Sequence, residues 1–257
     1  MNLNNLLERA SEAAVKAGHL IESSKDAAVF SKEGGDNLAS QIVTQADIAS
    51  EKLIIEHLTP SLEEYNLGLL SEEGTLPHWQ ESRFLKEYFW CIDPLDGTLP
   101  FSQGKHGYAV SIALVTKEGE PLIGVVYDPH RKNLYSALKG EGSLRNGKTF
   151  LVKSSESQKV NIKNSGPAVM NALQTIEEAP ALYYKEPHLE KRGGSLWDFA
   201  ATSLIQREAG GFNSDFKGRP LDLNRKDSTY MNHRGIIFAS DPSLILHLED
   251  LIKEHQS

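Results

Sequence analysis

Residues 90–101, WCIDPLDGTLPF, place two acids directly after an apolar run. The apolar run 88–92 is typical of a buried strand, and Asp93 and Asp96 follow it with Pro94 between them. A buried carboxylate is strongly destabilising unless a positive charge compensates it. We therefore expect a cation at this point of the fold, and other parts of the chain must supply its remaining ligands.

The length and composition are those of a globular protein. The chain has 257 residues, of which 39% are hydrophobic and 24% charged, enough for one large domain or two closely packed lobes. The net charge of -8 argues against binding to a nucleic-acid polymer, which depends on Lys and Arg. No segment approaches the length of an apolar membrane span, so no membrane partner is predicted.

The single cysteine, Cys91, excludes an intramolecular disulfide bond and favours a reducing, cytoplasmic location. Because Cys91 lies in the apolar run 88–92, it is expected to be a small core residue and not a nucleophile. The nine histidines show no metal-ligand spacing. They are expected at the surface or as hydrogen-bonded polar residues.

The hydrophobic pattern predicts a mixture of helices and strands. Helices are expected over 3–24, from Thr44 to about Leu58 with Pro60 ending it, over 167–175 and 197–209, and from Pro242 to Ile252. Strands are expected over 66–70, 88–92, 108–115, 122–127, 134–137, 181–184 and 235–239, with a hairpin at Asn146-Gly147. Residues 31–40 are expected to form a loop. Since no regular βαβ repeat occurs, a layered α+β fold is predicted.

Carboxylates occur at four separated places beside predicted strands and helices. They are Asp47, Glu72 with Glu73, Asp93 with Asp96, and Asp198. Taken alone, each has a simpler explanation, because acids are common in turns and in the first turn of a helix. Taken together, they offer the hard oxygen ligands that Mg²⁺ prefers.

The residues after Asp96 suit a phosphate near such a metal. The Leu95 carbonyl can turn toward the same ion, and Gly97 lets the backbone approach a ligand closely. If a short helix follows, the N–H groups of Gly97 and Thr98 point at the group above the metal. A phosphate is the expected occupant.

Four motifs in this order resemble the inositol monophosphatase family of lithium-sensitive, magnesium-dependent phosphatases. They are VTQAD at 43–47, SEEG at 71–74, DPLDGT at 93–98, and LWDFAA at 196–201 with EAGG at 208–211. The resemblance covers nearly the whole chain and implies an αβαβα sandwich and a homodimer. We divide the chain into an N-terminal α+β lobe, residues 1–157, with most metal ligands, and a C-terminal α/β lobe, residues 158–257, with the WD motif and the substrate rim.

The resemblance also implies roles for individual residues. Two or three Mg²⁺ ions are expected, the first held by Glu72, Asp93 and the Leu95 carbonyl, and the second by Asp93, Asp96 and Asp198. Thr98 and Asp47 would orient and help to deprotonate the attacking water, with Glu73 close behind the ligands. The amides of Gly97 and Thr98 would hold the phosphate. Lys32 is a candidate for a family lysine near the metal, and whether loop 31–40 closes over the site stays open.

The substrate is predicted less directly than the reaction. Lys185, in ALYYKEP at 181–187, stands where inositol monophosphatases carry an acid that contacts inositol hydroxyls. A second departure from the family pattern is Leu99-Pro100, where Asn or Lys usually follows DGT. Bisphosphate nucleotidases of this superfamily tend to be basic at the position of Lys185, so this residue would bind a second negative group of the substrate, or is a surface lysine.

Three functions are therefore considered. The first is a Mg²⁺-dependent phosphatase for a small phosphomonoester similar to inositol monophosphate. The second is a 3′(2′),5′-bisphosphate nucleotidase acting on 3′-phosphoadenosine 5′-phosphate. A non-catalytic metal-binding protein on the same fold is disfavoured, because Thr98 and Asp47 are both present.

Overall fold

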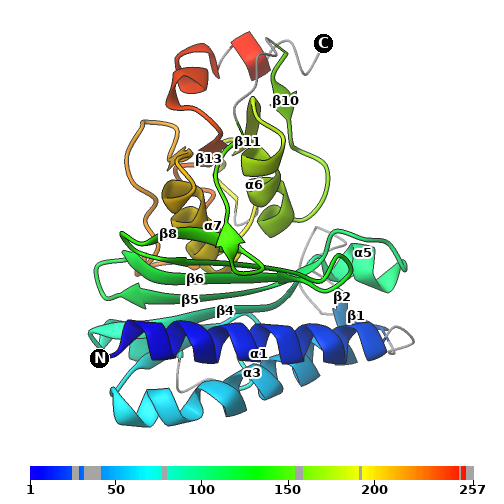
Figure 1. Ribbon diagram of the computed structural model, residues 1–257, viewed down its shortest axis with the longest axis vertical. Coiled ribbons are helices and arrows are strands. Elements are labelled where there is room, and N and C mark those ends of the chain that lie inside the picture. The colour runs from blue at the N-terminus through cyan, green and yellow to red at the C-terminus, as the bar shows by residue number, and fades with distance from the viewer. Residues whose placement is uncertain are drawn as a thin grey trace.

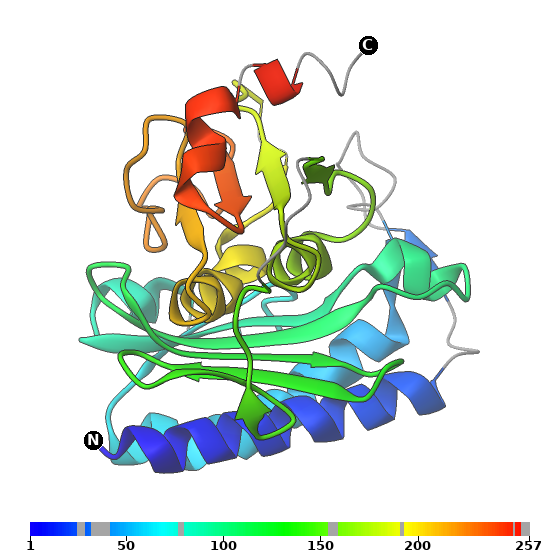
Figure 2. The same ribbon diagram turned by 45° about the horizontal axis from the view of Figure 1, so that its top comes forward.

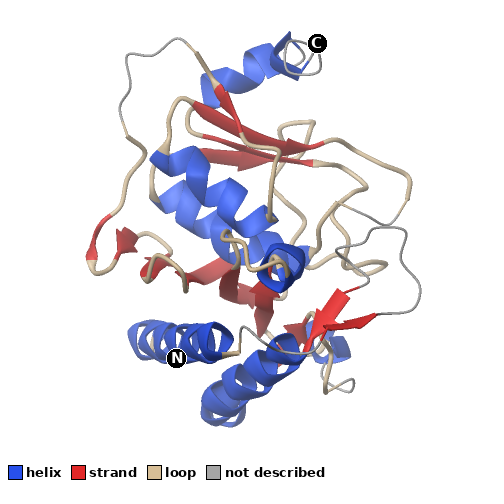
Figure 3. Cartoon of the chain, turned by 90° about the vertical axis from the view of Figure 1, so that its right-hand side faces the viewer, coloured by secondary structure: helices blue, strands red, loops and turns tan. Residues whose placement is uncertain are grey.

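A seven-stranded sheet separates two layers of helices in the computed structural model (Figure 1). Helices α1 and α3 cover one face of this sheet, and α6 and α7 cover the other. A four-stranded sheet lies beyond α6 and α7, so these two helices are enclosed between two sheets (Figure 3). The 3₁₀ helix η2 packs on the outer face of the smaller sheet (Figure 2). The five layers confirm the predicted αβαβα sandwich.

The structure describes residues 1–24, 29–31, 42–76, 80–153, 159–190, 193–248 and 250–252. Its helices are α1 (Leu3–Ser23), α3 (Gln45–Glu64), η1 (Glu81–Phe84), α5 (Thr98–Ser102), α6 (Ala168–Glu177), α7 (Leu196–Glu208) and η2 (Pro242–His247). No described helix is both long and apolar enough to cross a membrane.

The larger sheet consists, in spatial order, of β3 (Gly68–Ser71), β4 (Tyr88–Asp96), β5 (Ala109–Thr116), β6 (Pro121–Asp128), β7 (Asn133–Leu138), β8 (Gly142–Arg145) and β9 (Lys148–Thr149). The smaller sheet consists of β10 (Asn161–Ile162), β11 (Ala181–Lys185), β13 (Ile236–Ala239) and β12 (Phe212–Ser214). Strands β1 (Val29–Ser31) and β2 (Ile42–Thr44) form a separate antiparallel pair.

Small residues bring helices unusually close to the larger sheet. A Cβ atom on Gly18 of α1 would lie 2.3 Å from the ring of Tyr127 on β6. On the other face, a Cβ atom on Gly124 would lie 2.6 Å from the carbonyl oxygen of Ala201 in α7. Because real Cβ contacts are not this short, any larger residue would push the helix away from the sheet. The sheet is thus tightly packed on both faces.

Three predicted boundaries were wrong. Pro60 does not end the second helix, because α3 continues to Glu64. Pro60 is exposed, while Leu58 and Leu62 on either side of it are buried, so packing holds the helix together across the missing backbone hydrogen bond. The strand expected over 88–92 extends through Asp96. The last helix begins as the 3₁₀ helix η2, and of the described residues after it, 248 and 250–252 are α-helical.

Two further sequence predictions are not settled by the described residues. The loop predicted over 31–40 lies outside them, except for Ser31 at the end of β1. The division at residues 157 and 158 stays a prediction. One core cluster contains residues of both parts, such as Phe89 of β4 and Phe199 of α7.

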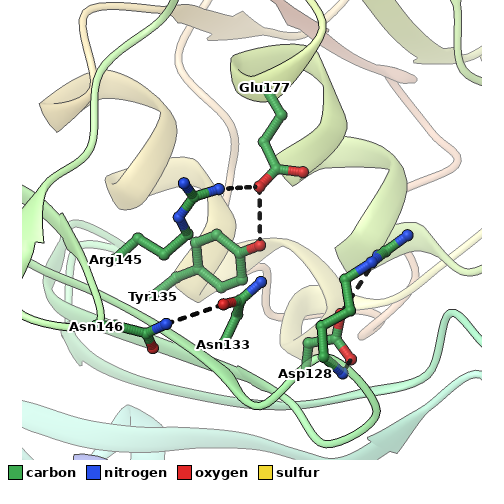
Figure 4. A network of polar contacts seen from close by, with 7 residues as sticks. Asp128, Asn133, Tyr135, Arg145, Asn146 and Glu177 are labelled. Carbon is green, nitrogen blue, oxygen red and sulfur yellow. Dashed lines mark hydrogen bonds and ion pairs between the residues drawn. The ribbon is translucent and has the colours of Figure 1, made fainter.

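Helix α6 is held at its C-terminal end by a polar network on the larger sheet (Figure 4). Glu177 accepts hydrogen bonds through the same oxygen, Oε1, from the Tyr135 hydroxyl at 3.0 Å and from Arg145 Nη1 at 2.9 Å. Tyr135 lies on β7 and Arg145 on β8. These contacts orient α6 over the sheet, and its opposite end faces the acids of β4.

Candidate metal centre

Three carboxylates meet where β4 ends against the first turn of α7. Ligand oxygens of Asp93, Asp96 and Asp198 all lie within 4.8 Å of one another. Asp93 and Asp96 belong to β4, and Asp198 lies in the first turn of α7. The structure therefore brings together three of the predicted metal ligands. Asp198 lies more than a hundred residues beyond Asp93 and Asp96 in the sequence.

An irregularity in β4 explains how Asp93 and Asp96 share one site. Residues three apart in a regular strand point to opposite faces of the sheet. Here the register with β5 moves from Asp93 opposite Ser111 to Asp96 opposite Ala109, so β4 carries one extra residue. Pro94 has no N–H to donate to the ladder, which favours a bulge at this point.

The three carboxyl groups strongly disfavour full ionisation. Burial, followed by the charges of Glu72, Asp198 and Asp96, raises the pKa of Asp93 well above its ordinary value. Burial and then the charge of Asp198 raise the pKa of Asp96 in the same way. Burial also raises the pKa of Asp198, although the Ser195 N–H opposes this effect. Without added positive charge, the cluster therefore binds protons more readily than free carboxyl groups do.

Backbone donors satisfy one oxygen of each acid. Asp93 Oδ1 accepts a hydrogen bond from the Leu95 N–H at 3.0 Å, and Asp96 Oδ2 accepts one from the Val169 N–H at 2.8 Å, at the start of α6. Asp198 Oδ2 accepts from the Ser195 N–H within a capping box that begins α7. These contacts fix the orientations of the carboxylates and leave their other oxygens for a ligand.

The other oxygen of Asp93 is the part of the site that most needs a cation. Asp93 Oδ2 is buried, and no group of the described residues donates a hydrogen bond to it. The Asp198 carboxyl lies within reach of the Asp93 carboxyl, and two carboxyl groups can hydrogen-bond only when one carries a proton. A divalent cation satisfies the same oxygens without a proton. An all-oxygen donor set suits Mg²⁺, so these residues fit the predicted ion.

Glu72 and Glu73 follow β3, the neighbour of β4. The Glu72 N–H donates to the Ile92 carbonyl at 3.2 Å, so the SEEG loop lies directly beside the end of β4. The Glu72 charge contributes to the raised pKa of Asp93, which places its carboxylate near the cluster. Glu73 is half-buried next to it in the loop. The roles of both acids, and the place of Glu73 close behind the ligands, stay predictions.

Thr98 and Asp47 form the predicted pair. Thr98 Oγ1 donates a hydrogen bond to Asp47 Oδ1 at 2.9 Å, and the Asp47 side chain is buried in the first turn of α3. Gly97, just before Thr98, has a φ of +93°, and a Cβ atom there would lie 2.6 Å from Pro167 Cγ. Only glycine fits this turn, which carries the chain from β4 into α5.

Two residues that the sequence did not single out hold the site in place. Glu51 is fully buried in α3, and its two carboxylate oxygens accept hydrogen bonds from the N–H groups of Gly74 and Thr75, each at 3.1 Å. Ser50 Oγ donates to the Pro94 carbonyl at 2.8 Å. With Asp47, these residues have the i, i+3, i+4 spacing of one helix face. That spacing, in QADIASE, was the signal that could have found them.

One face of α3 thus contacts three separate parts of the site. Asp47 binds Thr98, Ser50 binds the bulge of β4, and Glu51 binds the loop that carries Glu72 and Glu73. Helix α3 therefore sets the relative positions of the acids from β4 and the acids of the SEEG loop.

Lys185 is half-buried at the end of β11, and its positive charge lowers the pKa of both Asp96 and Asp198. The ammonium therefore acts on the acids themselves, which the sequence did not predict. Leu95 lies between the two acids of β4, and its carbonyl accepts a hydrogen bond from Thr98 Oγ1 at 3.3 Å, while its role as a metal ligand stays a prediction. Lys32 lies outside the described residues.

Comparisons with known proteins agree with this site. The model of the inositol monophosphatase family matches residues 2–185. Inositol monophosphatase 2 from Solanum lycopersicum is 32% identical over 251 residues, which cover 87% of this chain and 92% of the relative. Nus factor SuhB from Escherichia coli is 31% identical over 242 residues, or 84% of this chain and 87% of that protein.

The fold is shared with solved structures. The crystal structure of the extragenic suppressor protein suhB from Bartonella henselae matches with a TM-score of 0.76 and 24% identity, covering 96% of this chain and 97% of that one. The family model covers well over half of the chain, and the tomato relative is aligned across most of both proteins. Together with the motifs and the acid cluster, these matches show that the chain belongs to the inositol monophosphatase family.

Proposed function

We propose that this protein is a Mg²⁺-dependent phosphatase that hydrolyses a small phosphomonoester. The observation that carries the proposal is the buried oxygen Asp93 Oδ2, which belongs to the cluster with Asp96 and Asp198 and receives no hydrogen bond from the described residues. Family membership supports a phosphatase acting on small phosphorylated substrates. The Thr98–Asp47 pair favours an enzyme over a metal-binding protein without activity.

The acids would hold the ions and thereby position the substrate. Glu72, Asp93 and the Leu95 carbonyl are proposed for one Mg²⁺, and Asp93, Asp96 and Asp198 for a second, with a third ion left open. When bound, the ions supply the positive charge that polarises the phosphoryl group and stabilises the leaving oxygen. Glu72 follows β3, the parallel neighbour of the strand that carries Asp93, and backbone hydrogen bonds hold the acids of β4 and α7 in fixed orientations. The site is thus preorganised by the fold.

Thr98 and Asp47 would act on the attacking water. Because Thr98 Oγ1 donates its proton to Asp47, its lone pairs are available to accept a hydrogen bond from water. As Thr98 Oγ1 takes a proton from the water, its own proton would pass to the buried Asp47 carboxylate, so the pair would act together as a general base. Glu73 would support this base from the SEEG loop, and the amides of Gly97 and Thr98 would bind phosphate oxygens.

The substrate that we propose first resembles inositol monophosphate, since relatives carry that name. A bisphosphate nucleotide is the second candidate, and the specific observation in its favour is the half-buried Lys185 beside the acids. Several other expectations stay predictions. They are a homodimer, lithium sensitivity, a cytoplasmic location, and the absence of a nucleic-acid or membrane partner.

Phosphatase activity should depend fully on divalent ions. We expect exhaustive treatment with a chelator to reduce hydrolysis of an aryl phosphate to the background rate, because no other described group at the site supplies comparable positive charge to the phosphoryl group. Added Mg²⁺ or Mn²⁺ should restore the rate. Full activity in the chelated protein would refute the proposed mechanism.

The two substrate classes are separated by kcat/KM in the presence of Mg²⁺. Inositol 1-phosphate, 3′-phosphoadenosine 5′-phosphate and fructose 1,6-bisphosphate should be compared with the aryl phosphate as a reference. We expect inositol 1-phosphate to exceed the others by about tenfold or more, a difference of about 1.4 kcal/mol in transition-state binding. A preference for the nucleotide would replace the first candidate by the second.

Replacing Asp93, a fully buried acid of the cluster, should change activity and stability in opposite directions. We expect Asp93→Asn to lower kcat by more than about 100-fold, because even mutated partners of metal ligands typically cost 10–100-fold. In chelator, the same change should raise the melting temperature, because it removes one acid from a repulsive cluster.

The stability of the metal-free protein should depend on pH, because Asp93 binds protons differently in the folded and unfolded states. Since the folded-state pKa of Asp93 is raised, the folded protein binds more protons than the unfolded chain between the ordinary pKa of about 4 and the raised value. In measurements from about pH 5.5 upward, stability should therefore fall as the pH rises, and Asp93→Asn should make this slope shallower.

Asp227→Asn is the control for this measurement. A hydrogen bond from Arg225 lowers the pKa of Asp227 to about 2, so Asp227 stays ionised in both states over the tested range. The control should keep the wild-type slope. An equal slope in wild type and Asp93→Asn would show that Asp93 does not carry the buried charge.

A further inference from the structure

A second pocket lies near the end of β4 that is remote from the acids. It has a volume of about 390 Å³, and η1, the β5–β6 turn and the loop after β12 supply its lining residues Phe84, Lys117, Asn224 and Lys226. Lys117 follows Thr116, which pairs with Tyr88 at the start of β4, whereas Asp96 ends this strand. The nine residues of β4 span roughly 26 Å. The pocket is therefore separate from the metal centre.

The walls of this pocket are held together by Asn224, which is buried. Its Nδ2 donates a hydrogen bond to the Lys117 carbonyl at 2.8 Å, and its Oδ1 accepts one from Arg83 Nη1 at 2.9 Å. The β5–β6 turn also packs closely on this loop, since a Cβ atom on Gly119 would lie 3.0 Å from the Asn224 nitrogen. Three separate segments are thus fixed against one another, and the pocket is preformed.

A buried cation lies behind the pocket. Arg83 is 5% exposed, and its guanidinium carbon is 4.1 Å from the centre of the Phe84 ring. Its side chain bonds the neutral Asn224, and no carboxylate of the described residues forms an ion pair with it. Burial lowers the pKa of Arg83, although the charges of Glu81 and Asp222 act in the opposite direction. Because a guanidinium stays charged, this part of the fold favours an anion nearby.

The two lysines add positive charge at the mouth of the pocket. Lys117 and Lys226 are exposed, and neither ammonium forms an ion pair within the part of the chain that the structure describes. Asp227, the neighbour of Lys226, is already paired with Arg225. Three cations therefore surround one pocket, in a chain whose net charge is -8.

We propose that this pocket binds a nucleoside monophosphate, with the base stacked on Phe84 and the phosphate held by Lys117 and Lys226. The volume lies within the usual range of small-molecule sites, about 300–1,000 Å³. An aromatic ring beside positive charge is the combination that binds a base together with its phosphate. The inference goes beyond the proposed phosphatase, because the nucleotide is here a ligand and the residues that line this pocket include no carboxylate for a metal.

The test is calorimetric titration of the full chain with adenosine 5′-monophosphate in chelator. Chelation prevents turnover by the proposed phosphatase and leaves the acid cluster without the cations that a phosphate would need. Adenosine and inorganic phosphate are titrated separately, so that the contributions of the base and of the phosphate are distinguished.

The variants are Phe84→Leu, the double replacement of Lys117 and Lys226 by Met, and the control Lys148→Met. Methionine keeps much of the apolar lysine stem and removes its charge. Lys148 is also exposed, but it lies on β9, at the edge of the larger sheet opposite β3. Hydrolysis of an aryl phosphate with Mg²⁺ should be unchanged in all three variants, which checks that each one folds.

We expect saturable binding of adenosine 5′-monophosphate to the wild type, tighter than that of adenosine or phosphate. The double lysine variant should bind it at least about tenfold more weakly, since one exposed charge contact accounts for up to about fivefold. Phe84→Leu should weaken it by about fivefold or more and leave phosphate binding unchanged. Added salt should weaken wild-type binding, and Lys148→Met should bind as the wild type does.

Absence of saturable binding at millimolar nucleotide would overturn the proposal. An equal loss in Lys148→Met and the double lysine variant would also overturn it, and so would equal affinities for the nucleotide and for inorganic phosphate. Binding that requires Mg²⁺ and is unaffected by the lysine replacements would place the nucleotide at the metal centre. The pocket would then be refuted as a nucleotide site, while the proposed phosphatase would stand.

Discussion

Compensation of buried negative charge is the constraint on which the rest of this structure depends. Asp93, Asp96 and Asp198 bring ligand oxygens within 4.8 Å of one another, at the junction of a central strand and a buried helix. Such a cluster is unfavourable on its own, because each acid raises the pKa of its neighbours and burial removes the solvation of all three. Its presence is understandable if cations complete it.

The surrounding elements are arranged to hold the acids in this unfavourable position. The extra residue in β4 turns Asp93 and Asp96 to the same side, the first N–H groups of α6 contact Asp96, and the capping box of α7 fixes Asp198. At its other end α6 is tied to the larger sheet through Glu177. Helix α3 connects these parts to the SEEG loop through Glu51. The acid cluster thus destabilises the fold, and the packing around it offsets that destabilisation. Such a relation between stability and activity is common at active sites.

The sequence predicted the parts of the site that lie in short motifs. Asp93, Asp96 and Asp198 were expected together, and so was the contact between Thr98 and Asp47. Glu51 was missed because an acid on a helix normally points to solvent, and only the tertiary structure shows the two backbone donors that bury it. Its spacing from Asp47 was a usable signal that was not exploited.

Other features could not be read from local patterns. The passage of α3 through Pro60 depends on burial of Leu58 and Leu62 against other elements, which overrides the local preference. The extension of β4 through Pro94 depends on Ser50 and on pairing with β5. The influence of Lys185 on the acids depends on where β11 lies relative to α7, which is a property of the whole fold.

The most direct test of the account is to locate the cations. Crystals grown with Mn²⁺ in place of Mg²⁺ would reveal each ion by anomalous scattering. We expect a strong peak about 2.1 Å from Asp93 Oδ2, with oxygens of Asp96 and Asp198 also bound to ions in the cluster. A fully ordered Asp93, Asp96 and Asp198 cluster without any peak at saturating Mn²⁺ would contradict the claim that cations compensate these buried acids.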